Sequence, residues 1–216
     1  VDNNSEDLFL RRLGPALDPV GGVVRATDMV PAGPSRTRVR TPSIAVAKSA
    51  LLVAYRLERD PQRLIEQMHL PLAEAAKGLE PLKKGARRVD RTLGEVVLVN
   101  TDRTKGEGPS LACGRVGCFL TWNGEGAGGG AWAAFVEPTR GKPIWRRQFS
   151  RSGAHPAVAV SPSGQAQLVW YEGGKVLTAA FSRDTVGAPT RIARISGDQP
   201  PPSIVAGSRP GEWYLA

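Results

Sequence analysis

A repeated segment of about 46 residues constrains the fold of this chain more than any other feature of its sequence. A Pro-Ser-apolar-Ala segment, or a close variant of it, begins at Pro42, Pro109, Pro156 and Pro202. After a short turn, each copy continues into an apolar, aromatic-rich run: LLVAY at 51–55, CFLTW at 118–122, QLVWY at 167–171 and EWYLA at 212–216. Two short apolar runs joined by a tight turn predict a β-hairpin. The sequence therefore predicts the same hairpin four times.

A second hairpin is predicted between successive copies of the first. Residues 133–150 match residues 179–196 without a gap, at a constant offset of 46. Looser copies begin at Arg11-Arg12-Leu13 and at Arg87-Arg88-Val89. Each full repeat thus contains four short strands in an antiparallel meander, which is the pattern of a β-propeller blade. Such a sheet buries both of its faces only by stacking against neighbouring blades around an axis.

The composition favours the same fold class. The chain has 216 residues, and its 41% of hydrophobic residues is enough for a substantial core. Its 25 glycines and 18 prolines are typical of a protein with many tight turns. We therefore predict an all-β protein in which residues 1–216 form a single propeller domain of four-stranded antiparallel blades.

The first repeat is longer than the others, because the repeat prolines are separated by 67, then 47, then 46 residues. The extra residues fall between the second and third strands expected for that blade. Asp60-Pro61 has the residue types of a helix N-cap and first turn. Leu64, Ile65 and Met68 then follow at helical spacing. We expect a helical insertion over residues 60–83.

The chain begins and ends out of phase with the repeat. It opens on the third and fourth strands of one blade, over residues 8–27, and closes after the second strand of another, at Ala216. Either the two ends form one mixed blade that closes a four-bladed ring, or the chain is a fragment of a larger propeller. We favour the fragment, with a parent of about six to eight blades.

The repeat also carries a family resemblance. The runs PSIAVA at 42–47, QLVWY at 167–171 and DPVG at 18–21 resemble the repeat arrays of secreted or cell-surface bacterial β-propeller proteins. The resemblance covers nearly all of the chain outside residues 60–83. It implies the propeller fold, but it assigns no catalytic residue, because this architecture serves many functions.

The only two cysteines, Cys113 and Cys118, flank the turn of the hairpin that begins at Pro109. Antiparallel partners at such a turn lie close enough for a disulfide, with two buried free thiols as the alternative. A disulfide implies an oxidising compartment, so we expect an extracellular, periplasmic or cell-surface protein. A metal site is disfavoured because no further ligands cluster nearby. We expect no cofactor.

The net charge of +9 raises the question of nucleic-acid binding. Lys and Arg are spread along the chain and become dense only at 36–40, 83–91 and 146–147, without an aromatic-plus-basic RNA motif. We therefore do not expect a nucleic-acid partner, and attraction to an anionic surface or glycan is the alternative. No run of about 18 apolar residues exists, so no transmembrane segment is expected.

No catalytic constellation stands out in the sequence. No G-x-S-x-G motif occurs, and His155 directly precedes a repeat proline. A glycosidase needs two carboxylates about 5 to 10 Å apart, and the sequence pairs none of its loop carboxylates. These are Glu58, Asp60, Glu125 and Glu172.

Topology predicts where a partner binds. In a meander, the loops between second and third strands lie on the same face as the connections between blades, and we call this the loop face. The insertion, the glycine run 124–130 and the turn at 172–175 share it, and binding usually involves such loops. The tentative partner-binding residues are Asp60, Arg63, Lys83, Lys84, Glu125 and Glu172. We interpret the chain as a non-catalytic binding or scaffolding propeller that contacts a protein or glycan, the alternative being a sialidase-like glycosidase or a lyase.

Overall fold

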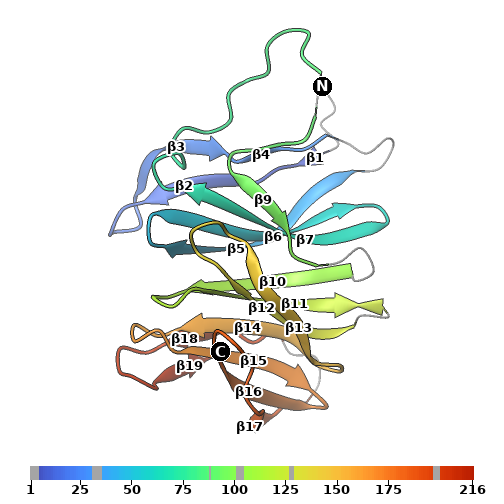
Figure 1. The fold of residues 1–216 in the computed structure, drawn as a ribbon, viewed down its shortest axis with the longest axis vertical. Coiled ribbons are helices and arrows are strands. Elements are labelled where there is room, and N and C mark those ends of the chain that lie inside the picture. The colour runs from blue at the N-terminus through green and yellow to red at the C-terminus, as the bar shows by residue number, and fades with distance from the viewer. Residues whose placement is uncertain (1–4, 31–35, 88, 101–104, 127–128, 197–199) are drawn as a thin grey trace.

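The structure is a computed structural model that describes residues 5–30, 36–87, 89–100, 105–126, 129–196 and 200–216. All of the named elements in these ranges are β-strands, and none is an α-helix. The strands form three sheets of four or five strands and three sheets of two strands. Figure 1 shows the larger sheets stacked on one another in chain order. The predicted all-β propeller of four-stranded blades is confirmed.

We call the three larger sheets the first, second and third blades. The first blade has the order β1-β5-β6-β7-β9, with β1 (Ser5–Glu6), β5 (Thr37–Ala47), β6 (Ala50–Arg59), β7 (Gln62–Pro71) and β9 (Glu95–Leu98). The second blade contains β10 (Lys105–Cys113), β11 (Cys118–Glu125), β12 (Gly130–Val136) and β13 (Pro143–Ser150). The third blade contains β14 (Ala154–Val160), β15 (Ala166–Glu172), β16 (Lys175–Phe181) and β17 (Thr190–Arg194). The meander predicted over residues 156–196 is thus confirmed.

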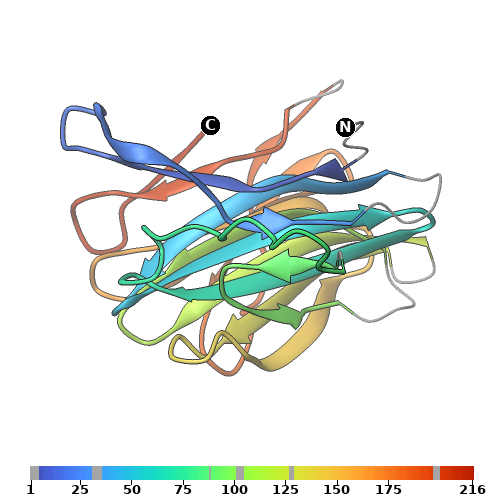
Figure 2. The same ribbon diagram turned by 90° about the horizontal axis from the view of Figure 1, so that it is seen from above.

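The remaining strands form three small pairs. They are β2 (Phe9–Leu13) with β3 (Pro19–Arg25), β4 (Thr27–Asp28) with β8 (Arg91–Thr92), and β18 (Ile204–Ala206) with β19 (Trp213–Leu215). A closed four-bladed ring would require β2–β3 and β18–β19 to form one sheet. They belong to separate sheets, so the described residues contain no such mixed blade. Figure 2 shows the β2–β3 hairpin projecting from the stack.

The repeat prolines mark a β-bulge in the innermost strand of each blade. The registers of β5, β10 and β14 shift where Pro42, Pro109 and Pro156 occur. The residue before each of these prolines has a φ of 45°, 53° or 50°. Proline is tolerated at a bulge near a sheet edge because no ladder hydrogen bond requires its missing N–H. The periodic prolines therefore mark the position of a kink that recurs in the inner strand of each blade.

Apolar side chains fill the spaces between successive blades. Between the second and third blades, the ring centroid of Phe119 lies 5.2 Å from that of Phe135 and 4.7 Å from that of Phe181. Trp170 is buried in the same cluster. Tyr171 is only half-buried, and its hydroxyl donates a hydrogen bond to the carbonyl oxygen of Pro200. The blades are thus held together mainly by aromatic and aliphatic packing.

The helix predicted over residues 60–83 is wrong. Residues 62–71 form β7, the third strand of the first blade, which pairs with β6 along its whole length. Leu64 and Met68 pack toward β2–β3, whereas Ile65 packs toward the second blade. A strand buried on both faces does not need to alternate apolar and polar residues. The spacing of the apolar residues in this strand is therefore similar to that of an amphipathic helix.

The extra residues of the first blade lie over 72–94, between its third and fourth strands. This connection arches over the β2–β4 region in Figure 1. Because it leaves the blade at the C-terminal end of β7, it begins at the end opposite the loop face. Arg87 and Val89, expected in a third strand, are exposed residues outside any strand, and Arg88 lies outside the described residues.

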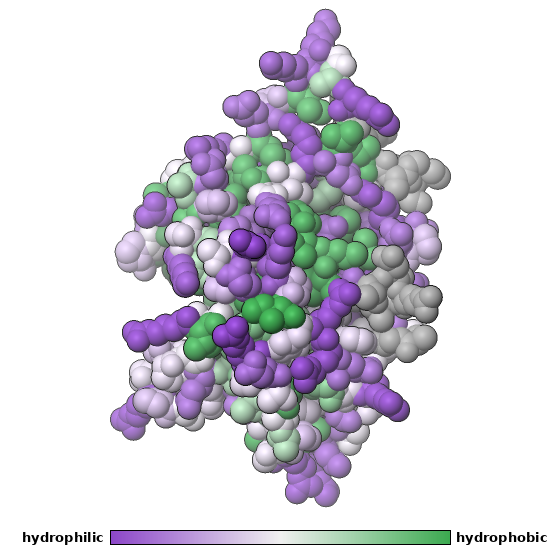
Figure 3. Space-filling model, viewed as in Figure 1, coloured by the Kyte–Doolittle hydropathy of each residue, from purple (hydrophilic) through white to green (hydrophobic). Residues whose placement is uncertain are grey.

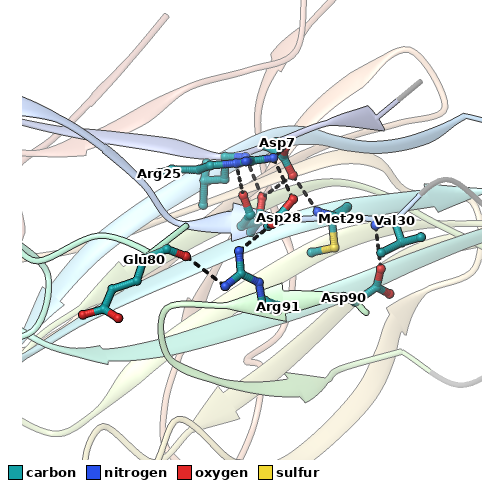
Figure 4. Close-up of polar contacts among 10 residues, drawn as sticks. Asp7, Arg25, Asp28, Met29, Val30, Glu80, Asp90 and Arg91 are labelled. Atoms are coloured by element: carbon teal, nitrogen blue, oxygen red, sulfur yellow. Dashed lines mark hydrogen bonds and ion pairs between the residues drawn. The ribbon is translucent and has the colours of Figure 1, made fainter. Parts of the chain in front are cut away.

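Ion pairs around a buried aspartate hold this connection in place (Figure 4). Asp28 accepts hydrogen bonds from Nη2 of Arg25 at 2.8 Å and from Nη2 of Arg91 at 2.6 Å. The backbone N–H of Val30 donates to Oδ1 of Asp90 at 2.8 Å. Paired charges of this kind are required where a carboxylate is nearly inaccessible to water.

Two further expectations concern the disulfide and the surface. Cys113 and Cys118 form the predicted disulfide across the β10–β11 turn. In the view of Figure 3, hydrophilic residues cover most of the surface and apolar residues show as separate patches. Among the described residues, no helical segment has the length and hydropathy needed to cross a bilayer.

Truncating Phe119 tests the packing between blades. Phe119→Ala removes a ring that contacts both Phe135 and Phe181, so we expect the free energy of unfolding to fall by about 3 to 5 kcal/mol. Val116→Ala, in the exposed turn nearby, should change it by less than about 0.5 kcal/mol. Chemical denaturation of both variants measures the difference, and equal losses would contradict this packing.

Candidate axial binding site

A cavity of about 420 Å³ lies where the innermost strands of successive blades converge. The three bulge residues Thr41, Gly108 and His155 all line it, one from each complete blade. Residues 201–204, which lead into β18, form a further part of its wall. We call it the axial cavity. Its volume lies in the range of small-molecule sites in proteins.

The axial cavity has a polar wall made of side chains from two blades. Arg56 comes from β6 of the first blade, whereas Glu107 and Asn123 come from β10 and β11 of the second. Nη1 of Arg56 donates a hydrogen bond to Oε1 of Glu107 at 2.8 Å. Oδ1 of Asn123 is buried and has no hydrogen-bond partner among the described residues. An unpartnered buried acceptor is costly, so this oxygen is well suited to accept a bond from a ligand.

A cluster of two arginines and two glutamates adjoins the cavity, and we call it the Arg–Glu cluster. It consists of Arg56, Arg63, Glu107 and Glu125. Nη1 of Arg63 donates to Oε1 of Glu107 at 2.8 Å and to both carboxylate oxygens of Glu125 at 2.9 Å. The cluster therefore links the first blade to the second. Its side chains are partly exposed, so we expect each pair to contribute no more than about 1 kcal/mol to stability.

The environment of Glu107 raises its pKa. Burial is the largest cause, and the hydrogen bond to Glu125 together with the negative charge of that carboxylate raises the pKa further. Arg56 and Arg63 act in the opposite direction but do not cancel the rise. Two carboxyl groups that contact the same guanidinium nitrogen are close enough to compete for one proton. The cluster can therefore hold one glutamate protonated more easily than an isolated side chain would be.

The structure brings three of the tentative partner-binding residues together. Arg63 and Glu125 form the ion pair just described, although they are 62 residues apart in sequence. Asp60 and Arg63 line a second, polar pocket of about 310 Å³. Its other charged lining residues are Arg36, Arg38, Glu58 and Lys105. Their role in binding a partner remains a prediction.

The other three predicted residues do not join this group. Glu172 accepts hydrogen bonds from Oγ of Ser150, Oγ of Ser152 and Nε1 of Trp170, so its oxygens fasten the connection between the second and third blades. Lys83 and Lys84 are exposed on the 72–94 connection, outside any strand. The glycine run 124–130 is described only in part, because residues 127–128 lie outside the described residues.

Sequence reasoning missed Arg56, Glu107 and Asn123. A signal for Glu107 was present, since it lies two residues before a repeat proline, at the position that Arg40 occupies in the first blade. The bulge residues line the axial cavity, so a charged residue next to a bulge can line it as well, as Glu107 does. Arg56 and Asn123 lie inside strands, and no comparable sequence signal identifies them. Among the described residues, no group of three or more potential ligands is placed to hold a metal ion.

Comparison with known proteins supports the fold. No protein-family model matches the chain, and no curated protein sequence matches it. An α-L-arabinofuranosidase from Fusarium graminearum, solved in complex with an iminosugar inhibitor, is similar with a TM-score of 0.54 and 13% identity, over 88% of this chain and 55% of that chain. The structure of the Dos1 propeller gives a TM-score of 0.43 and 10% identity, over 88% of this chain and 43% of that chain.

A third similar structure is the catalytic domain of a GH62 α-L-arabinofuranosidase from Coprinopsis cinerea, with a TM-score of 0.42 and 11% identity, over 72% of this chain and 51% of that chain. The chain thus spans about half the length of the solved chains that it matches. At 13% identity, the likeness to the Fusarium graminearum structure concerns the fold alone.

Two glutamates should influence stability with opposite dependence on pH. The folded-state pKa of Glu107 is raised above its unfolded-state pKa. Between these two pKa values the native state binds more protons than the unfolded chain, so the stability falls as the pH rises through that range. The pKa of Glu172 is lowered, chiefly by the Trp170 hydrogen bond, so its contribution is lost as the pH falls through its folded-state value. Glu107→Gln should remove the loss of stability that accompanies rising pH. Glu172→Gln should remove the loss of stability that accompanies falling pH.

Chemical denaturation from about pH 3 to pH 8 measures both effects, since an unperturbed glutamate has a pKa of about 4.3. Each variant is compared with the parent chain at every pH. If the two substitutions changed the pH profile in the same direction, the environments described for Glu107 and Glu172 would be incorrect.

Proposed function

We propose that the chain is a secreted or envelope-associated β-propeller that binds a glycan in the axial cavity, at its loop face. The observation that carries this proposal is the convergence of the three bulge residues and a polar wall on one cavity. The lining residues lie toward the ends of β5, β10 and β14 where the chain enters each blade, so the ligand approaches from the loop face. The Cys113–Cys118 disulfide supports an oxidising compartment.

The charge balance of the cavity favours a neutral ligand. Arg56 and Arg63 are paired with Glu107, with Glu125 and with the adjoining Glu58, so neither guanidinium is left without a carboxylate partner. Paired guanidinium and carboxylate groups keep further hydrogen-bonding capacity, and Asn123 adds a free acceptor. Such mixed donors and acceptors suit the hydroxyl groups of a sugar better than an anionic or cationic group. This arrangement supports a neutral oligosaccharide as the ligand.

Glycoside hydrolysis is the alternative to simple binding, and the geometry of the glutamate pair favours binding. Glu107 and Glu125 contact the same nitrogen of Arg63 and hydrogen-bond to each other. The two catalytic carboxyl groups of a glycosidase are about 5 to 10 Å apart, so that a sugar fits between them. The Arg–Glu cluster therefore supports a site that binds a sugar better than one that cleaves it.

Ligand binding can be tested with variants that keep the local backbone. The probes are neutral arabino- and xylo-oligosaccharides, an acidic oligosaccharide and an unrelated extended peptide, measured by calorimetry. Neutral oligosaccharides should bind, and His155→Asn or Asn123→Ala should weaken binding by about tenfold, the effect of losing one good hydrogen bond. Asparagine tolerates the positive φ at position 155. Lys48→Asn is the matched control, because Lys48 also has positive φ but lies in the turn at the opposite end of β5.

Each other outcome has a distinct meaning. Binding of the peptide alone, or of the acidic oligosaccharide alone, would contradict a neutral-glycan site. Turnover of a chromogenic glycoside that Glu107→Gln abolishes would replace simple binding with hydrolysis. An equal loss of binding in Lys48→Asn would show that the cavity variants act through the fold.

A further inference from the structure

A groove lies beside the outer strands of the third blade, on the side that faces the second blade. It has a volume of about 790 Å³, and Ser152, Leu177, Pro189 and Arg191 are among the residues that line it. Its lining residues are all different from those of the axial cavity. Both neighbouring blades have all four of their strands in the described chain. We call this site the outer groove.

Three cations of the third blade face the second blade at the outer groove. Arg191 stands opposite Leu177, and Arg194 stands opposite Lys175, in the β16–β17 pair. Leu177 packs in the aromatic cluster between the two blades, and directly opposite residues of an antiparallel pair share one face of the sheet. Lys175 lies two residues from Leu177, so it shares that face as well. Lys175, Arg191 and Arg194 are all exposed.

The second blade directs a fourth cation to the same side. Arg147 stands opposite Ala133, which is buried in the cluster between the second and third blades. The guanidinium of Arg147 lies 4.6 Å from the centroid of the Trp145 ring. That ring packs on Phe181 of the third blade, with the two centroids 5.5 Å apart. Stacking on an aromatic ring orients a guanidinium and leaves its in-plane N–H donors available.

These cations have little compensating negative charge. Glu172 is the one carboxylate among the described residues that line the outer groove, and its oxygens already accept the three hydrogen bonds given above. Arg147, Arg191 and Arg194 form no ion pair with any carboxylate of the described residues. Arg63 of the first blade, by contrast, is paired with two glutamates. The outer groove therefore has an excess of positive charge.

The strand register adds a second reason to expect an anion at this site. Lys175 and Arg194 are direct cross-strand neighbours, and like charges in that position destabilise a sheet. An anionic group bound between them would remove the repulsion. A cleft lined mainly by one sign of charge also raises the local concentration of ions of the opposite sign.

We propose that the outer groove binds the carboxylate groups of an acidic polysaccharide. An arginine can hold a carboxylate through two parallel hydrogen bonds, and cations from both blades suit a chain that carries several such groups. Single-stranded nucleic acid fits less well, because the contacts of Trp145 with Arg147 and Phe181 occupy the ring that a base would need for stacking. A recessed groove also suits a chain better than it suits a flat membrane surface.

Calorimetry with a short oligogalacturonate tests the proposal. The parent chain should bind this probe, and Arg191→Gln should weaken the binding by about tenfold, through the loss of a hydrogen bond between charged groups. The matched control is Arg115→Gln, which removes the same charge from the exposed turn between β10 and β11. The control should change the affinity by less than about twofold, because solvent screens a charge outside the groove.

The same variants separate this proposal from the one for the axial cavity. Arg191 does not line that cavity, so Arg191→Gln should bind neutral oligosaccharides as the parent chain does. If neutral oligosaccharides failed to bind while the oligogalacturonate bound as predicted, the axial proposal would fail and this one would stand.

Three results would overturn the binding of an acidic polysaccharide in the outer groove. The first is a parent chain that does not bind the oligogalacturonate. The second is equal weakening in Arg191→Gln and Arg115→Gln, which would show a response to net charge alone. The third is tighter binding of a sulfated oligosaccharide, a single-stranded oligonucleotide or an anionic lipid vesicle than of the oligogalacturonate, with the same loss in Arg191→Gln.

Discussion

A four-stranded sheet with two apolar faces must be covered on both sides, and the rest of this structure depends on that requirement. In the second blade, one face packs against the first blade through Leu120, and the other face packs against the third blade through Phe119. The alternation of side chains along β11 thus assigns neighbouring residues to different interfaces. Because every blade packs its two faces against its neighbours in the same way, the repeat in the sequence produces the same interface between successive blades. The stack then brings the innermost strands together along one axis.

The candidate binding site lies at the axis, where the innermost strands converge. Each inner strand kinks just before the repeat proline, and the kinked residues line one cavity. The same part of the stack brings charged residues from two blades into contact, as Arg63 and Glu125 show. Rigid packing between blades fixes these side chains more firmly than a single mobile loop would. The proposed binding site therefore lies at the interface between repeats.

The repeat allowed much of the architecture to be predicted from the sequence, because strand pairing, blade order and the disulfide all follow from local patterns. The third strand of the first blade could not be assigned in this way, since β7 is buried on both faces and shows no alternation. The site was predicted only in part. Arg63 and Glu125 follow from loop topology, whereas Glu107 and Asn123 depend on how two blades align, which a single repeat does not encode. The 72–94 connection likewise depends on Asp28, far away in sequence.

The central claim is that the repeat proline marks a left-handed bulge facing the axis, and Thr41 offers the most direct test. A β-branched residue at a φ of 45° is strained, whereas glycine adopts that conformation without cost. The measurement is the difference in unfolding free energy between Thr41→Gly and Thr41→Ala. The account predicts that the glycine variant is more stable than the alanine variant by about 1 kcal/mol. In a regular extended strand glycine would instead be less stable than alanine by about 0.5 to 1 kcal/mol, and that result would contradict the account.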